Sequence, residues 1–277
     1  MSSVRVDEAE LHYTRVGQGP ACVVPCALGT AHYELLAAGL TERFSLVFVD
    51  LRGSGRSTGS PAELTFDVLA RDLEAVREQV GASRWWVLGY SILGVPAIEY
   101  ARRCSGSVSH VVVAGTPPHG DMGRLAQASA AFFEATAPAE RKQIFAENLA
   151  KLPPGTDPRM AVPAQTPMRF FDPRLDVMPL LAVIDFKPAF FAHLMGPLTS
   201  SWEVTAGPPL TVPLLVAHGR HDYVVPHTIW DDVLPKLATA SFRLFERSGH
   251  QPFFEEPQRF VEVVTEWMGH AAAGRPQ

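Results

Sequence analysis

The hydrophobic positions in the first half of the chain alternate between short unbroken runs and one longer stretch with a helical period. The runs, rich in β-branched side chains, are residues 21–26, 46–50, 85–89 and 110–114. Such runs are typical of strands buried on both faces of a parallel sheet. Residues 66–80 carry apolar side chains at the spacing of an amphipathic helix, namely Val68, Leu69, Leu73, Val76 and Val80. Residues 4–6 and 11–15 flank a polar turn and predict an opening hairpin.

The pattern changes after Gly115. Residues 116–213 are rich in Pro, Ala, Phe and Met and predict helices, at residues 125–136, 140–151 and 188–195. Strand-like runs return at residues 214–218 and 242–245, with helices predicted near 229–237 and at about 257–268. We therefore predict an α/β fold with a mostly parallel sheet of eight strands. Residues 1–117 and 209–277 would form the core domain, and residues 118–208 a helical lid inserted into it.

Composition and charge narrow the classes of function. The 277 residues are 47% hydrophobic and 19% charged, which is typical of a globular protein, and a net charge of −5 argues against a nucleic-acid partner. Apolar runs are too short to predict a membrane partner, and residues 1–10 lack the apolar segment of a signal peptide. Three cysteines favour a reducing, cytoplasmic location over a disulfide framework, and no spacing indicates a metal site.

A serine lies where a strand is predicted to turn into a helix. Residues 89–94 read Gly-Tyr-Ser-Ile-Leu-Gly, between the run 85–88 and a helical stretch at 95–103. A tight turn there would lift the Ser91 hydroxyl above the sheet, and the Ile92 N–H could donate to an oxyanion. An isolated serine at this place is more often only a helix cap. The other polar residues at strand ends decide between the two interpretations.

A histidine and an aspartate follow two later strands. His250 comes just after the last predicted strand, and Asp222 just after the run 214–218. Since the carboxyl ends of parallel strands face one crevice, Ser91, Asp222 and His250 are predicted to meet there as nucleophile, acid and base. Asp231 is the alternative acid. The nearby histidines are expected to be loop or core residues, namely His218, His221 and His227.

With these residues in place, the chain resembles the α/β-hydrolase superfamily, and within it the proline iminopeptidase-like group. Residues 50–57 match the D-x-R-G-x-G-x-S turn of the superfamily, and residues 89–91 match the start of its G-x-S-x-G elbow. Residues 219–226 and 248–257 are similar to its acid and histidine loops. The segment Arg-Phe-Phe-Asp-Pro at residues 169–173 and the later Trp230 resemble the proline iminopeptidase-like group. The resemblance implies a hydrolase that uses no cofactor.

Two departures from the superfamily pattern lie close to the serine. Leu93 stands where the elbow usually has glycine, which predicts a crowded turn with compensation by small neighbours or a side chain that borders the substrate pocket. Residues 25–29, Pro-Cys-Ala-Leu-Gly, replace the usual His-Gly of the oxyanion strand, and we expect Ala27 to supply the second oxyanion N–H.

The aromatic and methionine side chains of the middle third are expected mostly to pack, and some of them to roof the crevice. They are Phe132, Phe133, Met160, Met168, Phe170, Phe171, Phe186, Phe190 and Phe191. Together with Leu93, Phe170 and Phe171 are the candidates for substrate contact. The sequence thus predicts a serine hydrolase for an ester, amide or lactone of a small, largely apolar molecule. Two alternatives stay open: a lyase or carbon–carbon hydrolase that uses the same triad, and a non-catalytic ligand-binding member of the fold.

Overall fold

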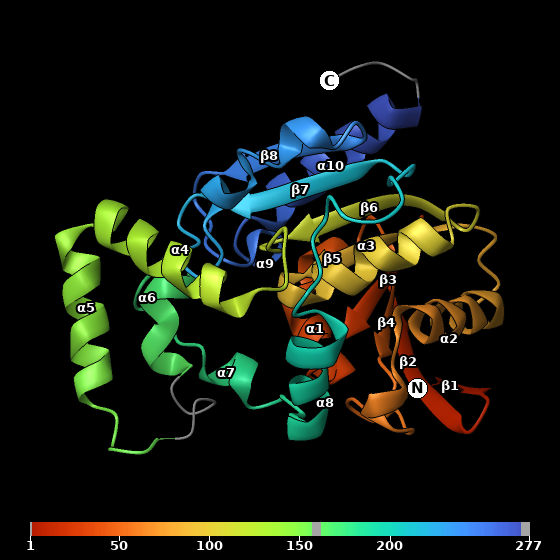
Figure 1. Cartoon of the computed structure of the whole chain (residues 1–277), viewed down its shortest axis with the longest axis horizontal. Coiled ribbons are helices and arrows are strands. Elements are labelled where there is room, and N and C mark those ends of the chain that lie inside the picture. The colour runs from red at the N-terminus through yellow and green to blue at the C-terminus, as the bar shows by residue number, and fades with distance from the viewer. Residues whose placement is uncertain (1, 157–161, 273–277) are drawn as a thin grey trace.

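The computed structural model of the protein describes residues 2–156 and 162–272, and within them eight strands form a single sheet (Figure 1). The strands are β1 (Ser2–Val6), β2 (Ala9–Val16), β3 (Ala21–Cys26), β4 (Ser45–Asp50), β5 (Trp85–Tyr90), β6 (Val108–Ala114), β7 (Leu214–Gly219) and β8 (Ala240–Phe245). Their order is β1-β2-β4-β3-β5-β6-β7-β8, and β2 pairs antiparallel with β1 and β4 while all other pairs are parallel. The predicted fold class is confirmed.

Three of the strands are buried along their whole length, as the unbroken apolar runs predicted. Every residue of β4, β5 and β7 is buried. Strand β3 tolerates Pro25 because this strand pairs with β5 only at Cys22 and Val23, so the missing N–H of Pro25 interrupts no bond on that side. The chain crosses from one buried strand to the next through helices, which places the following loops at one edge of the sheet.

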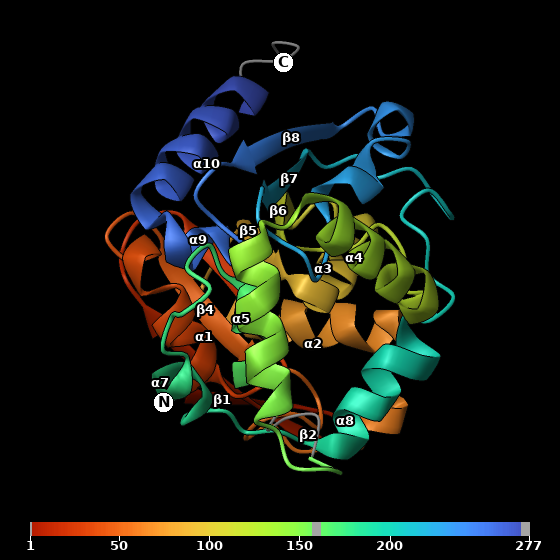
Figure 2. The same ribbon diagram turned by 90° about the vertical axis from the view of Figure 1, so that its left-hand side faces the viewer.

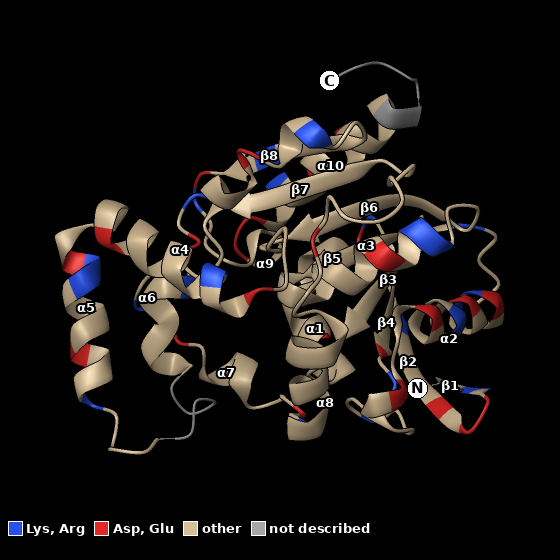
Figure 3. Cartoon of the chain, viewed as in Figure 1, with Lys and Arg blue, Asp and Glu red and all other residues tan. Residues whose placement is uncertain are grey.

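Helices cover both faces of the sheet. They are α1 (Thr30–Leu36), α2 (Phe66–Gln79), α3 (Gly94–Arg103), α9 (Pro252–Glu255) and α10 (Pro257–Ala272). Helices α2 and α3 pack against each other on one face, and α1, α9 and α10 lie on the other (Figure 2). Acidic and basic residues are interspersed along α2 and α5, so neither helix presents a face of one charge (Figure 3).

The segment between β6 and β7 is built of helices in its described parts. They are α4 (Met122–Thr136), α5 (Ala139–Ala150), α6 (Thr166–Arg169), α7 (Met178–Leu181), α8 (Pro188–His193) and a short turn at Leu194–Leu198. The segment stands at one end of the sheet, drawn from green to teal in Figure 1. Met160 lies outside the described residues. Asp121 begins α4 by accepting hydrogen bonds from the N–H groups of Gly123 and Arg124.

Two local expectations need correction. The helix predicted near residues 229–237 is wrong: this stretch holds two single 3₁₀ turns, His227–Trp230 and Leu234–Lys236. Pro235 has no N–H to donate and is incompatible with an uninterrupted α-helix there. The sequence pattern also missed α1, a helix of seven residues that follows Gly29 at a φ of 86°. Seven residues are too few to display a clear amphipathic period.

The turn after β4 is held by charged and polar side chains. Arg52 donates to both carboxylate oxygens of Asp72 on α2, at 3.0 and 2.6 Å, and both side chains are buried. The Asp50 carboxylate accepts the Arg56 N–H at 2.9 Å. Gly55 has a φ of 48°, and a Cβ there would lie 2.3 Å from the Asp50 carboxylate. The residues of the D-x-R-G-x-G-x-S pattern therefore shape a turn that anchors β4 to α2.

Candidate active site

Ser91 lies at a strained turn at the end of β5. Its φ is 53°, a left-handed conformation that costs a residue with a side chain about 1–3 kcal/mol. Two glycines let the chain turn this tightly. A Cβ at Gly89 would lie 2.5 Å from the Gly94 Cα, and a Cβ at Gly94 would lie 2.1 Å from Thr116 Oγ1. The serine is half-buried, and α3 starts three residues later.

The structure brings Ser91 together with the two residues that the sequence paired with it. His250 Nε2 lies 3.0 Å from Ser91 Oγ, and His250 Nδ1 lies 2.8 Å from Asp222 Oδ2. Both His250 and Asp222 are fully buried. The three side chains thus form one hydrogen-bonded chain, with the hydroxyl at its accessible end. Asp222, not Asp231, is the carboxylate beside His250.

Backbone groups fix the orientation of this chain. The other oxygen of Asp222, Oδ1, accepts the N–H groups of Val224 and Val225 at 3.0 and 2.8 Å. The carboxylate can therefore offer only Oδ2 to the imidazole. A Cβ at Gly115 would lie 2.8 Å from His250 Nδ1, so the ring fits closely against the backbone after β6. The hydrogen bond from Nδ1–H to Asp222 leaves Nε2 free to accept a proton from Ser91.

The other histidines close to the acid loop, one at the end of β7 and two after it, pack against aromatic rings. His218 is fully buried between Trp230 and Phe242, and burial lowers its pKa to about 4, which keeps the ring neutral. His221 lies edge-on to Phe171, and His227 edge-on to Phe132. These positions agree with the loop and core roles expected for all three.

Ala27, the expected oxyanion donor from the β3 turn, is buried, and its N–H points to a side-chain hydroxyl. The Ala27 N–H donates to the Tyr33 hydroxyl at 3.3 Å. A substrate oxyanion at this amide would therefore share it with, or displace, the Tyr33 oxygen. Ile92 is the second residue of the 3₁₀ turn Ser91–Leu93, and the first N–H groups of a helical turn have no partner within it. The sequence offered no signal for Tyr33, since α1 itself was missed.

Leu93 points into the core. Its exposed fraction is 2%, and it belongs to the same buried cluster as Ala27 and Ala114, two of the small residues proposed to make room for it. Leu93→Ala is expected to lower the free energy of unfolding by about 2–5 kcal/mol, because it removes buried carbons from a packed site. Urea unfolding measures this, with Ile92→Ala, whose side chain is only half-buried, as the smaller-effect control. A loss below about 0.5 kcal/mol would show that Leu93 is not a packing residue.

The two aromatic candidates for substrate contact differ in exposure. Phe170 is buried, while Phe171 is among the exposed large hydrophobic residues. Arg141 of α5, a residue that no sequence pattern singled out, donates to the carbonyl oxygens of Phe170 and Phe171 at 2.8 and 2.5 Å. The backbone at residues 170–171 is thereby held against α5. The neighbouring Arg169 contacts His250, because the His250 N–H donates to the Arg169 carbonyl at 2.6 Å.

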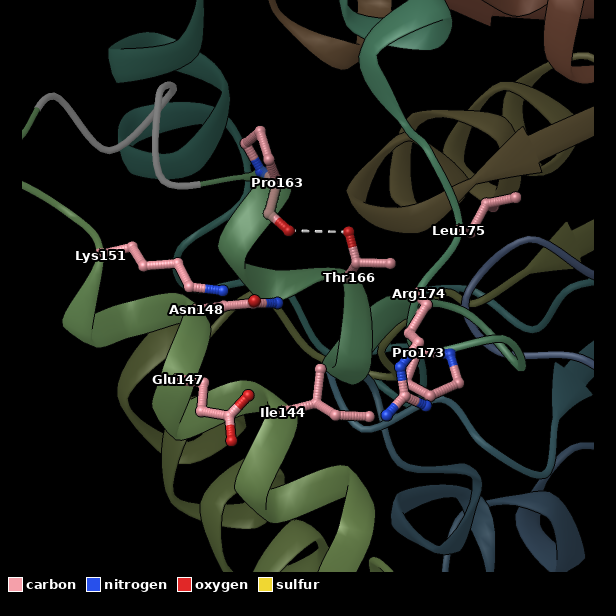
Figure 4. A pocket seen from close by; sticks show the side chains of 9 residues that line it. All are labelled: Ile144, Glu147, Asn148, Lys151, Pro163, Thr166, Pro173, Arg174 and Leu175. Carbon is pink, nitrogen blue, oxygen red and sulfur yellow. Dashed lines mark hydrogen bonds between the residues drawn. The ribbon is translucent and has the colours of Figure 1, made fainter.

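Two cavities stand out on the surface, and neither is lined by Ser91, Asp222 or His250. One, of about 310 Å³, lies between α5 and the start of α6, with polar side chains such as Lys151 and Asn148 at its wall (Figure 4). The other, of about 390 Å³, lies beside α1 and is mostly apolar.

In the part of the chain that the structure describes, no helix is long and apolar enough to span a bilayer, and no group of three or more His, Cys, Asp or Glu is placed to hold a metal ion.

An eight-stranded sheet with a serine at a strained strand-to-helix turn, and a histidine and an aspartate in loops at the same edge, defines the class of α/β hydrolases. The model of the alpha/beta hydrolase fold family matches residues 22–257. The chain belongs to the α/β hydrolase fold family, and it is a hydrolase of the esterase-like kind.

Individual relatives can be aligned with this chain over most of its length. The AB hydrolase superfamily protein YclE of Bacillus subtilis is 27% identical over 95% of this chain and 96% of its own. The pimeloyl-[acyl-carrier protein] methyl ester esterase of Vibrio vulnificus YJ016 is 28% identical over 94% of this chain and 98% of its own. Among solved structures, an alpha/beta fold family hydrolase from Bacillus anthracis superposes with a TM-score of 0.72 at 20% identity, covering 96% of this chain and 98% of its own.

Proposed function

We propose that the protein is a serine hydrolase that cleaves an ester, amide or lactone of a small, largely apolar molecule through an acyl-enzyme. The observation that carries the proposal is the continuous chain from Ser91 Oγ through His250 to Asp222, with 3.0 and 2.8 Å spacings and the second aspartate oxygen held by two N–H groups. An ester is the favoured bond, because the Vibrio vulnificus relative is named for ester cleavage.

In the proposed reaction, Ser91 Oγ attacks the substrate carbonyl carbon while His250 Nε2 takes the hydroxyl proton. The tetrahedral intermediate collapses, the bond to the alcohol or amine breaks, and His250 gives its proton to the leaving group. A water molecule then loses a proton to His250 and attacks the acyl carbon, and the proton returns to Ser91 Oγ as the acid leaves. Asp222 stabilises the imidazolium in both halves. The proposed oxyanion donors are the N–H groups of Ile92 and Ala27.

The helical segment at residues 118–208 is proposed to act as a lid over a core formed by residues 1–117 and 209–277. Support comes from the contact of its inner edge with the histidine loop, where the His250 N–H donates to the Arg169 carbonyl. Phe170 and Phe171 follow Arg169 directly and are the proposed roof of the site. A cytoplasmic location stays a prediction from the cysteine content.

The narrower likeness to proline iminopeptidases also stays a prediction. Trp230, one of the residues on which it depends, is fully buried and donates to the Thr116 carbonyl at 2.8 Å, which accounts for it as a packing residue. Triad-dependent carbon–carbon cleavage is the other candidate reaction, and the test below separates it from ester hydrolysis.

A fluorophosphonate probe and a panel of substrates test the proposal. We expect the probe to label Ser91, identified by peptide mass spectrometry, and p-nitrophenyl acetate and butyrate to be hydrolysed with a burst of p-nitrophenol. A phosphonate adduct should place its oxygen between the Ile92 and Ala27 amides. Labelling without turnover of esters, while a vinylogous 1,5-diketone is cleaved, would favour carbon–carbon hydrolysis. An unlabelled protein that cleaves neither substrate would contradict the proposed reaction.

A further inference from the structure

A carboxylate that the proposed reaction does not use lies between the helical insert and the histidine loop. Glu255, the last residue of α9, accepts the Phe171 N–H on Oε1 at 2.6 Å and the Gly249 N–H on Oε2 at 2.8 Å. Phe171 belongs to the insert, and Gly249 directly precedes His250. One side chain therefore holds the backbone of both segments, each by a charge-assisted hydrogen bond of the stronger kind.

The two segments that Glu255 joins also touch each other closely. The His250 N–H donates to the Arg169 carbonyl at 2.6 Å, and a Cβ at Gly249 would lie 2.2 Å from that same carbonyl oxygen. On the far side, Arg141 donates to the carbonyl oxygens of Phe170 and Phe171. The backbone at residues 169–171 therefore packs against Gly249 and His250 with little free space between them.

We propose that Glu255 is a positioning residue that couples the inner edge of the proposed lid, residues 169–171, to His250 and so sets the distance from the base to Ser91. This inference rests on the proposed function of the same site. We call the contact between residues 169–171 and residues 249–250, bridged by Glu255, the seam. A substrate that shifts Phe170 or Phe171 would act on His250 through this seam. The Glu255 side chain binds the backbone N–H groups of Phe171 and Gly249 and forms no hydrogen bond with Ser91, so its effect on the reaction passes through those two residues.

The charge state of Glu255 is sensitive to pH near neutrality. Burial raises its pKa to about 7, against the opposing effect of the N–H groups of Phe171, Gly249 and Gln251, and the Asp222 carboxylate raises it further. The charged and titratable groups that interact with Glu255 from other elements are Asp222, Tyr90 and Arg141. Protonation removes acceptor capacity from one oxygen, so the seam is expected to loosen as pH falls below about 7.

The raised pKa of Glu255 affects the stability of the fold in the opposite direction to its effect on the position of His250. Because the pKa of Glu255 in the folded protein lies above its ordinary value, burial favours the protonated form. Its contribution to stability is full below the unfolded pKa, about 4.3, and is lost as pH rises toward 7. The ionised carboxylate that best positions His250 is therefore the form that the fold tolerates less well. This opposition is typical of a group placed for function instead of stability.

Glu255→Gln tests the proposal, because a carboxamide must present its NH₂ to either the Phe171 N–H or the Gly249 N–H. We expect kcat for p-nitrophenyl acetate to fall about 10- to 100-fold with a much smaller change in KM, as for a base displaced by a fraction of an ångström. We also expect the pH profile of kcat between 6 and 8 to lose one ionisation. The matched control is Glu256→Gln: Glu256 accepts the Arg247 N–H and the Ser248 hydroxyl but does not reach the insert, and should keep that ionisation.

A second measurement does not depend on turnover or on the folding of the variant. In the wild-type protein, hydrogen–deuterium exchange at the amides of Phe171 and Gly249, corrected for intrinsic exchange, should lose protection about tenfold between pH 8 and pH 6. Unchanged protection, or a Glu255→Gln enzyme with wild-type kcat and pH profile, overturns the coupling. If the exchange result holds but the fluorophosphonate fails to label Ser91, the proposed reaction is at fault and the coupling stands.

Discussion

Ser91→Ala is expected to lower kcat for a short p-nitrophenyl ester by about 10⁶-fold, the size of loss seen when the serine of another Ser-His-Asp hydrolase is removed. Without Oγ, His250 Nε2 has no hydroxyl within 3.0 Å to deprotonate, and no acyl-enzyme can form. Steady-state hydrolysis and fluorophosphonate labelling measure the effect. Both the burst phase and the label should vanish together.

The conformation of Ser91 supplies a control for this experiment. The Ser91→Ala variant would keep the φ of 53° and its strain, so its melting temperature should be close to that of the wild type. Ser91→Gly should be equally inactive, because it also lacks the hydroxyl, but it relieves the backbone strain. Its free energy of unfolding should exceed that of Ser91→Ala by about 1 kcal/mol. If Ser91→Ala keeps a tenth or more of the wild-type rate, Ser91 is not the nucleophile.

Asp222→Asn is expected to lower kcat by about 10⁴-fold while the protein stays folded. The reason lies in the two N–H groups of Val224 and Val225, which bind Oδ1 at 3.0 and 2.8 Å. They require the oxygen of the new carboxamide at that place, which turns its NH₂ toward His250 Nδ1. The imidazole must then accept at Nδ1 and carry its proton on Nε2, where it cannot take a proton from Ser91.

Asp231→Asn is the matched control, because Asp231 is the alternative acid that the sequence offers, while its side chain is exposed and the carboxylate bonded to His250 is that of Asp222. It should retain kcat within about twofold, since surface substitutions of this kind rarely disturb a site. The loss in Asp222→Asn should also show in the rate of fluorophosphonate labelling, which depends on the base but not on product release. Equal losses in the two variants would contradict the assignment of Asp222.

The sequence predicted the fold class and the candidate nucleophile from local patterns. Strands buried on both faces, such as β4 and β5, must be apolar along their whole length, so they appear as unbroken runs. A strand followed by Gly-x-Ser and a helix has few geometries available, and parallel strands direct their following loops to one edge. Short or interrupted elements were harder: α1 was too brief to show a period, and Pro235 divided the helix expected near residues 229–237.

Contacts between groups far apart in the chain could not be predicted from local patterns. Ser91 and His250 are 159 residues apart, and no local rule states that they come within 3.0 Å. The choice of Asp222 over Asp231, the burial of Leu93 and the bond from the Ala27 N–H to Tyr33 likewise depend on how separate elements pack. Glu255 is the clearest example. Its sequence context indicates only a position in the histidine loop at residues 248–257, and its two partners, Phe171 and Gly249, reach it from different parts of the fold. Local patterns fix which elements form, because hydrogen bonding and burial act on neighbours in the chain, whereas the partners of each side chain are set by packing across the whole fold.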